Sequence, residues 1–292
     1  MQQASDFLAE SEALEQLIAP LQASDFAHPT GFKSWTFETI MRHLHFWNHM
    51  ANLALTAPDD FQAELKPAVE AMMAGKTLPD IELAKFPEGG LELVSLWQAG
   101  FREVAAAYQQ ADPSDRVSWV GPSMSARSSI TARQMETWAH GQAIADELGI
   151  ERSEDDRIRN IVVLGVNTFG WSFMVRGMEV PEDQPALRLT SPSGESWEYG
   201  NPDADQVISG MAHEFAQVVT QTATSRIPSW CARVTRPSFG CATPSVLRAQ
   251  RPSRPRRACG ALNPRPEREA ITSLSATARP SAPVRQQVRC GC

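Results

Sequence analysis

Two segments of this 292-residue chain place side chains that bind metals where a buried site could form. Within residues 131–149 Glu136 and His140 lie four positions apart, so on a helix they project toward one point. In the segment that begins at Thr36, a rotation of about 100° per residue places His43 on the apolar face. A carboxylate facing a core is costly unless it is paired or bound to a metal. The pattern permits a site formed by His43, Glu136 and His140, with open positions for water or substrate.

The spacing alone leaves a purely structural interpretation open. His43 can be a hydrogen-bonded core histidine, and Glu136 can pair with Arg133 or Arg127. An isolated E-x-x-x-H pattern is weak evidence for a metal.

Two further histidines belong to the same helical segment as His43. His45 and His49 are four positions apart and could bind a metal, but they share a face with Glu38 and Arg42. We therefore expect both histidines to meet solvent.

Charge divides the chain into two regions. Residues 1–222 carry 14 Lys and Arg against 32 Asp and Glu, whereas residues 223–292 carry 13 Arg, no Lys and two Glu. All five cysteines lie in the second region. We find no apolar run long enough for a transmembrane helix, and the polar N-terminus lacks the pattern of a signal peptide. A cytoplasmic protein with no membrane partner is expected.

Residues 223–292 do not look like a folded domain. Arg, Pro, Ser and Ala dominate, and such a composition cannot offset chain entropy by burying apolar surface. We expect a disordered tail, and we favour its being translated out of the ancestral frame, because the helical pattern breaks abruptly after Gln221. One alternative is that the tail binds nucleic acid, and the sequence offers no other basis for a nucleic-acid partner. Another is that its cysteines bind a metal, although no pair of them has C-x2-C spacing.

Residues 1–150 predict a bundle of about four helices. A first helix carries Phe7, Leu14 and Ile18, and a second begins at Thr36 as N-cap. A third follows Gly89-Gly90. The fourth is expected to begin at Thr131, with Gln134 completing a capping box, and to end at Gly149. A weaker helix is expected over 60–73 and loops over 57–60 and 78–80.

Residues 155–222 predict a small α+β domain. We expect a helix from about 158 to 177, strands over 186–190 and 196–199, and a last helix over 203–221. Arg176 could bind a substrate carboxylate, although a surface ion pair is the favoured interpretation. His213 is interpreted as a packing or surface residue. The fold class is therefore α+β, mainly α.

The candidate ligands lie in two segments that resemble a known family. Trp35-Thr-Phe-Glu-Thr-Ile-Met-Arg-His43-Leu44 resembles the W-(S/T)-x(6)-H-L segment of the DinB-like and mycothiol-dependent maleylpyruvate isomerase N-terminal family. Met135-Glu136-Thr-Trp-Ala-His140 is similar to its second segment. Residues 119–133 resemble a branch often labelled a putative metal-binding or wyosine-base-formation protein. The resemblance spans about residues 5–222.

The resemblance implies a DinB-like four-helix bundle that holds zinc through His43, Glu136 and His140, completed by water or a substrate thiolate. It also implies that residues 155–222 form a small sterol-carrier-like domain. In the family an acidic residue commonly follows the last ligand by three positions, where this chain has Ala143. Relatives continue past the position of Gln221 with ordered structure, so the second domain is expected to be incomplete.

We expect the protein to bind a divalent metal. We further expect it to be a zinc-dependent isomerase or transferase that uses a small thiol to act on a small electrophilic substrate. The resemblance alone suggests mycothiol, and any thiolate must come from outside, since residues 1–222 contain no cysteine. Alternatives are a metal-dependent hydrolase and a non-catalytic metal- or small-ligand-binding protein. Iron, nickel or manganese also suit the ligands. The wyosine label has no support in the residues, and the oligomeric state stays open between monomer and homodimer.

Overall fold

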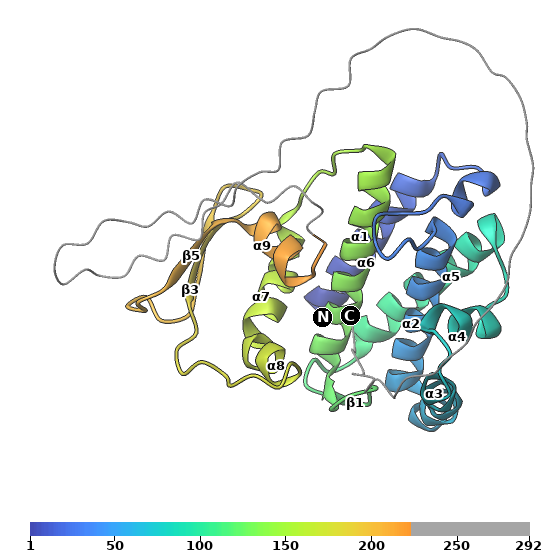
Figure 1. The fold of residues 1–292 in the computed structure, drawn as a ribbon, viewed down its shortest axis with the longest axis horizontal. Coiled ribbons are helices and arrows are strands. Elements are labelled where there is room, and N and C mark those ends of the chain that lie inside the picture. The colour runs from blue at the N-terminus through green and yellow to red at the C-terminus, as the bar shows by residue number, and fades with distance from the viewer. Residues whose placement is uncertain (223–292) are drawn as a thin grey trace, which may run out of the picture. The chain divides into compact units, whose positions relative to one another are not determined.

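The computed structural model describes residues 1–222, so the expectations about the arginine-rich segment 223–292 lie outside the described residues. Four long helices form a bundle in which α1 and α2 each contact both α5 and α6 (Figure 1). None of the described helices is both long and apolar enough to cross a bilayer. The bundle helices are α1 (Gln2–Ile18), α2 (Phe37–Thr56), α5 (Gly90–Gln110) and α6 (Ala126–Leu148), with η1 (Ala23–Ala27) between the first two.

Capping residues set most bundle boundaries where the sequence predicts them. The Thr36 side chain accepts a hydrogen bond from the Thr39 N–H at the start of α2. α5 begins after Gly89, and α6 ends at Gly149, which has a φ of 67°. That left-handed conformation favours glycine and ends the helix.

The predicted start of α6 was wrong. The helix begins five residues earlier than Thr131, at Ala126, because Ser125 caps it by accepting from the Ser128 N–H. A short antiparallel ladder of β1 (Arg116–Val117) and β2 (Met124–Ser125) leads into this cap. A true N-cap therefore lies one and a half turns before the capping-box pattern.

Two further helices connect α2 with α5. α3 (Pro58–Met73) begins two residues before the expected residue 60, so the predicted loop 57–60 was wrong, and Pro67 lies inside the helix. α4 (Leu78–Lys85) lies where the loop 78–80 was predicted, so that prediction was wrong. Thr77 and Asp80 form a reciprocal capping box at its start, and Pro79 lies in its first turn, where no N–H partner is needed.

The prediction that His45 meets solvent was also wrong. α2 contacts α3, α4, α5 and α6, so its polar-looking face is covered as well as its apolar face. His45 is buried and its ring lies 4.3 Å from that of Phe86. His49 is partly exposed and pairs with Glu64 at 3.0 Å.

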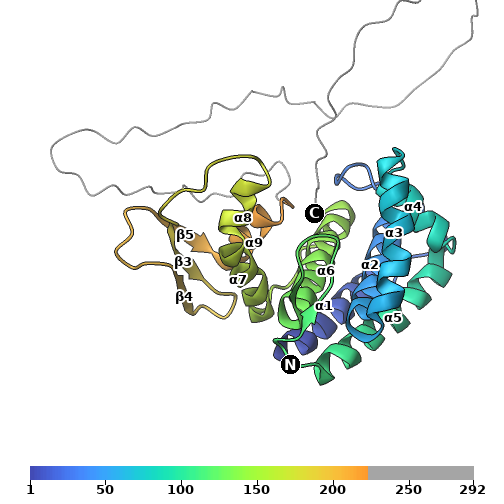
Figure 2. The ribbon, with the colours of Figure 1, turned by 90° about the horizontal axis from the view of Figure 1, so that it is seen from below.

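The second region contains a three-stranded sheet and three short helices. In both views α7 and α9 lie between the sheet and α6 (Figures 1 and 2). The strand order is β4-β3-β5, with β3 antiparallel to β4 and parallel to β5. The elements are η2 (Asp156–Ile158), α7 (Arg159–Asn167), α8 (Phe169–Met174), β3 (Ala186–Thr190), β4 (Ser196–Tyr199), β5 (Val207–Met211) and α9 (Ala212–Val219).

Two boundaries in this region differ from the prediction. The expected helix 158–177 divides at Thr168, which separates α7 from α8. The expected helix 203–221 is helical only in α9, because residues 207–211 pair with the free edge of β3 as β5. Tertiary pairing overrides the local pattern there. The two expected strands, 186–190 and 196–199, are confirmed.

α6 belongs to two hydrophobic clusters at once. One cluster fills the bundle, and Ile130 and Ile144 contribute to it from α6. The second joins Trp138 and Ala139 of α6 to α7, the sheet and α9. Both clusters lie in one compact unit, and the domain boundary placed between 150 and 155 stays a prediction.

Buried ion pairs fasten α1 to the segment that follows α6. Glu10 is 1% exposed and accepts hydrogen bonds from Arg152 and from Arg157 Nε, the latter at 2.7 Å. One carboxylate therefore pairs with two guanidinium groups.

We expect Glu10→Gln to destabilise the protein by about 2–4 kcal/mol, because two partly buried arginines lose their anion. Urea unfolding monitored by circular dichroism measures this. Glu12→Gln, on the exposed side of the same helix, is the matched control. Equal, small shifts for both variants would contradict the structural role of Glu10.

A pH-dependent prediction concerns Glu154. Burial raises the pKa of its carboxyl, and Arg152 and a hydrogen bond from Trp138 offset this only in part. Because the folded pKa exceeds the unfolded one, stability from this group is present below the unfolded pKa and is lost as pH rises through the folded pKa. Glu154→Gln is expected to raise the melting temperature at neutral pH and to have no effect near about pH 4. An identical shift at both pH values would refute this.

Candidate metal centre

The structure brings together the three side chains that the sequence nominates. His43 from α2 and Glu136 and His140 from α6 offer ligand atoms that lie within 4.8 Å of one another. Glu136 Oε2 is 3.5 Å from His43 Nε2 and 3.2 Å from His140 Nε2. His43 and His140 are both buried, and the Glu136 side chain is 14% exposed.

The two separations that involve Glu136 suit a shared divalent ion. Zinc binds nitrogen and oxygen at about 2.0–2.2 Å in tetrahedral sites, which places neighbouring ligand atoms about 3.3 Å apart. The two separations to Glu136 Oε2 bracket this value. Two imidazoles and one carboxylate would leave one tetrahedral position for a further ligand.

A fourth residue, Glu82 of α4, orients His43. Its Oε1 lies 2.7 Å from His43 Nδ1 and accepts a hydrogen bond from Trp47 Nε1 at 3.1 Å. When Nδ1 carries the proton and donates it to Glu82, the Nε2 lone pair faces Glu136 and His140. Glu82 is completely buried, so it acts within the core.

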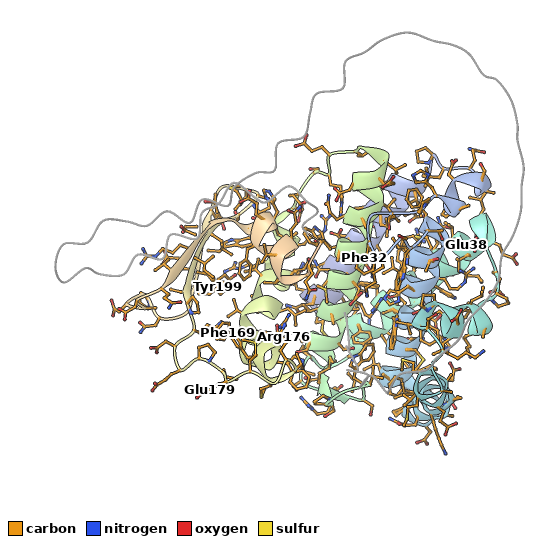
Figure 3. The ribbon with its side chains drawn as sticks, viewed as in Figure 1. Phe32, Glu38, Phe169, Arg176, Glu179 and Tyr199 are labelled. Carbon is orange, nitrogen blue, oxygen red and sulfur yellow. The ribbon has the colours of Figure 1, made fainter. Side chains whose placement is uncertain are left out.

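Aromatic rings enclose the two histidines. Trp35 stacks on His140 with ring centroids 5.8 Å apart and an interplanar angle of 8°, and its edge-on contact with His43 is 5.2 Å. Phe32, which is labelled in Figure 3, contacts His140 edge-on at 5.1 Å. These rings limit the access of water to the histidines.

The loop that carries these rings is held in an unusual conformation. Its ends pair through Pro29 and Thr36, and Lys33 and Ser34 have φ values of 50° and 58°. Non-glycine residues rarely adopt this left-handed region, and such strain often accompanies functional sites. The loop thus positions its aromatic residues at a conformational cost.

The charges of the three groups are strongly coupled. Burial opposes the charged form of His43, but the facing carboxylates of Glu136 and Glu82 outweigh it and raise the pKa of His43. Burial and the neighbouring His43 lower the pKa of His140, against the opposing effect of Glu136. The pKa of Glu136 lies well below its usual value despite burial, because both imidazoles face it. Glu136 is therefore an anion placed between two imidazoles.

The structure does not contain the alternative ion pairs of Glu136. Arg133 donates from Nε to Asn48 Oδ1 at 3.1 Å and forms no ion pair with Glu136, and Arg127 is exposed at the start of α6. Ala143 stands where the family commonly has an acidic residue. Its side chain packs against the bundle core.

Comparison with known proteins shows the family of the chain. Residues 7–145 match the family model of the mycothiol maleylpyruvate isomerase N-terminal domain. A Mycobacterium tuberculosis protein described as uncharacterized, present in strains H37Rv and CDC 1551, is 36% identical over 217 residues, which cover 74% of this chain and 84% of that protein. The chain belongs to the mycothiol maleylpyruvate isomerase N-terminal domain family.

Solved structures show the same fold. Two crystal structures of the mycothiol-dependent maleylpyruvate isomerase, one of them a histidine-to-alanine mutant, align with a TM-score of 0.50. Their sequences are 13% and 14% identical to this chain, and the alignments cover 76–77% of it and 89–90% of theirs. At this identity the comparison confirms the predicted architecture, a DinB-like bundle with a small α+β region.

The two remaining candidates of the sequence analysis lie in the second region. Arg176 follows α8, is exposed, and donates from Nη1 to the Ser172 carbonyl at 2.5 Å (Figure 3). Within residues 1–222, no hydrogen bond or ion pair joins Arg176 to the triad, and its binding of a substrate carboxylate stays a prediction. His213 is half-buried on α9.

Sequence reasoning missed Glu82. The signal that could have found it is the Thr77-Leu-Pro-Asp80 pattern, which combines a capping box with proline in the first turn. That pattern predicts a helix at 78–85, and Glu82 lies on its buried side.

Proposed function

We propose that His43, Glu136 and His140 hold one divalent ion and that zinc fits this site. The observation that carries the proposal is the approach of three ligand atoms from two helices to within 4.8 Å of one another, with Glu136 Oε2 at 3.2 and 3.5 Å from the two imidazole nitrogens. Two nitrogens and one oxygen form a donor set that zinc accepts readily.

We propose further that the chain is an isomerase or transferase that uses a low-molecular-weight thiol on a small electrophilic substrate. When bound, the ion would lower the pKa of a thiol or water at its free position and so supply a nucleophile at neutral pH. Residues 1–222 contain no cysteine, so the thiol comes from outside. Mycothiol is the candidate, because the matching family and the similar solved structures carry its name.

The protein's own residues would prepare this chemistry. Glu82 fixes the His43 tautomer, so that Nε2 is free to act as a ligand. Phe32 and Trp35 shield the two imidazoles from water, which strengthens electrostatic interactions inside the site. The partly exposed edge of Glu136 marks the side from which a ligand can approach.

Elemental analysis and thiol-dependent turnover test this proposal together. The full-length chain is expected to bind about one divalent ion per molecule, and His140→Ala is expected to lose it while remaining folded. With mycothiol and an electrophilic substrate such as maleylpyruvate, the wild type is expected to turn over and the chelated protein to be inactive.

His28→Ala is the matched control, because His28 pairs with Glu147 outside the triad. It should retain both metal and activity. A wild type that binds no divalent ion would overturn the metal site, and metal-dependent turnover without any thiol would favour a hydrolase.

A separate prediction concerns Glu82. Glu82→Gln keeps an acceptor for His43 but removes the charge, and we expect it to weaken metal affinity about tenfold. Glu82→Leu removes both and should weaken it about a hundredfold. Competition titration with a chromogenic chelator measures these constants.

Glu64→Gln provides a like-for-like comparison, because Glu64 also pairs with a histidine, His49, outside the triad. It should leave metal affinity unchanged. Equal affinities for wild type and Glu82→Leu would show that Glu82 has no role in orienting His43.

A further inference from the structure

Arg133 is a buried cation without an anionic partner in direct contact. It lies one turn before Glu136 on α6 and is 2% exposed. Its Nε donates to Asn48 Oδ1, whereas its Nη2 has no hydrogen-bond partner, and no carboxylate of residues 1–222 lies within ion-pair distance. A buried guanidinium in this condition is costly.

The side-chain amide of Asn48 also has a donor without a hydrogen-bond acceptor. It is completely buried on α2, and its Nδ2 also lacks a partner among the described residues. Two donors without acceptors therefore lie beside each other, one turn along the α2–α6 contact from the triad. Such a place favours negative charge nearby.

The buried charges near the triad can be counted. Three ionised side chains lie in or directly around the triad: Glu136 within it, Glu82 hydrogen-bonded to His43, and buried Arg133 one turn before Glu136 on α6. Histidines are neutral when they bind a metal. Two carboxylates and one guanidinium give a net charge of −1, and a divalent ion would change it to +1.

We infer that Arg133 makes the metal-loaded centre select a monoanion, a thiolate or a carboxylate, as its further ligand. A net positive charge in a buried site is unfavourable, and one anion neutralises it. Without Arg133 the metal-loaded centre would already be neutral, so binding of an anion would be less favourable. This inference rests on the proposed metal site and assigns Arg133 a role in ligand specificity.

The charge argument predicts opposite effects on two affinities. Arg133→Met removes a positive charge, so the divalent ion should bind as tightly as in the wild type or more tightly. The anion should bind about tenfold more weakly or worse. A residue that only supports the fold would weaken both, so the opposite signs distinguish the two roles.

The experiment uses the full-length chain loaded with Co²⁺, whose visible spectrum reports its ligands. N-acetylcysteine and acetate are titrated at fixed pH into wild type, Arg133→Met and the charge-conserving Arg133→Lys. Arg133→Lys, when its ammonium is protonated, is expected to keep the anion affinity closer to wild type than Arg133→Met does, because the positive charge is retained. Circular dichroism verifies that each variant is folded.

A second variant changes the charge in the other direction. Glu82→Gln should bind the anion more tightly at saturating Co²⁺, and it tests the inference even if Arg133→Met does not fold. Unchanged anion affinity in Arg133→Met, joint weakening of metal and anion, or weaker anion binding in Glu82→Gln would overturn the inference. Absence of Co²⁺ binding by the wild type would instead refute the proposed metal site and the inference with it.

Discussion

The contact between α2 and α6 concentrates polar groups that a protein core normally excludes. Glu136 lies between two imidazoles, Arg133 reaches Asn48, and Tyr108 bonds to Ser129 further along. Desolvation opposes each of these groups, and only partners at short distance offset it. The pairing requires one register of α2 against α6, because a shift by one residue would rotate a ligand out of the triad. The rest of the fold serves to hold that register.

Elements outside the two helices complete the site. α4 brings a carboxylate to the Nδ1 side of His43, and the loop before α2 brings Trp35 and Phe32 to the opposite imidazole. Both are fixed locally, α4 by its capping box and the loop by the pairing of its ends. The acidic residue that the family commonly has at the position of Ala143 is absent, and the buried carboxylate beside His43 comes from another helix. The carboxylate partner of His43 thus depends on tertiary packing rather than on a fixed spacing in α6.

Periodicity was sufficient for part of this site and not for the rest. An i,i+4 pair on one helix and an inward-facing residue on another follow from helical geometry, which is why His43, Glu136 and His140 could be nominated from the sequence. The burial of His45 could not be predicted, because helical periodicity describes one helix and cannot show that α4 and its C-terminal Phe86 cover its second face. β5 was missed for a related reason, since the free edge of β3 is a property of the sheet and not of residues 207–211. Periodicity also predicted the bundle, but the contact of Glu82 with His43 and of Arg133 with Asn48 became visible only in the folded structure.

The second region contributes no side chain to the triad, yet it bears on the geometry of the site through α6. Trp138 lies between Glu136 and His140 in sequence but packs into the other hydrophobic cluster, against α7 and the sheet. A helix held on two faces cannot rotate to relieve strain on one of them, so packing of Trp138 fixes the direction in which Glu136 and His140 project. Gly165 of α7 allows Val219 and Phe215 of α9 to approach closely, where a Cβ would lie only 3.1 Å from Val219. The close packing of α7 and α9 therefore supports the face of α6 opposite the triad, and the geometry of the triad depends on residues far from it in the sequence.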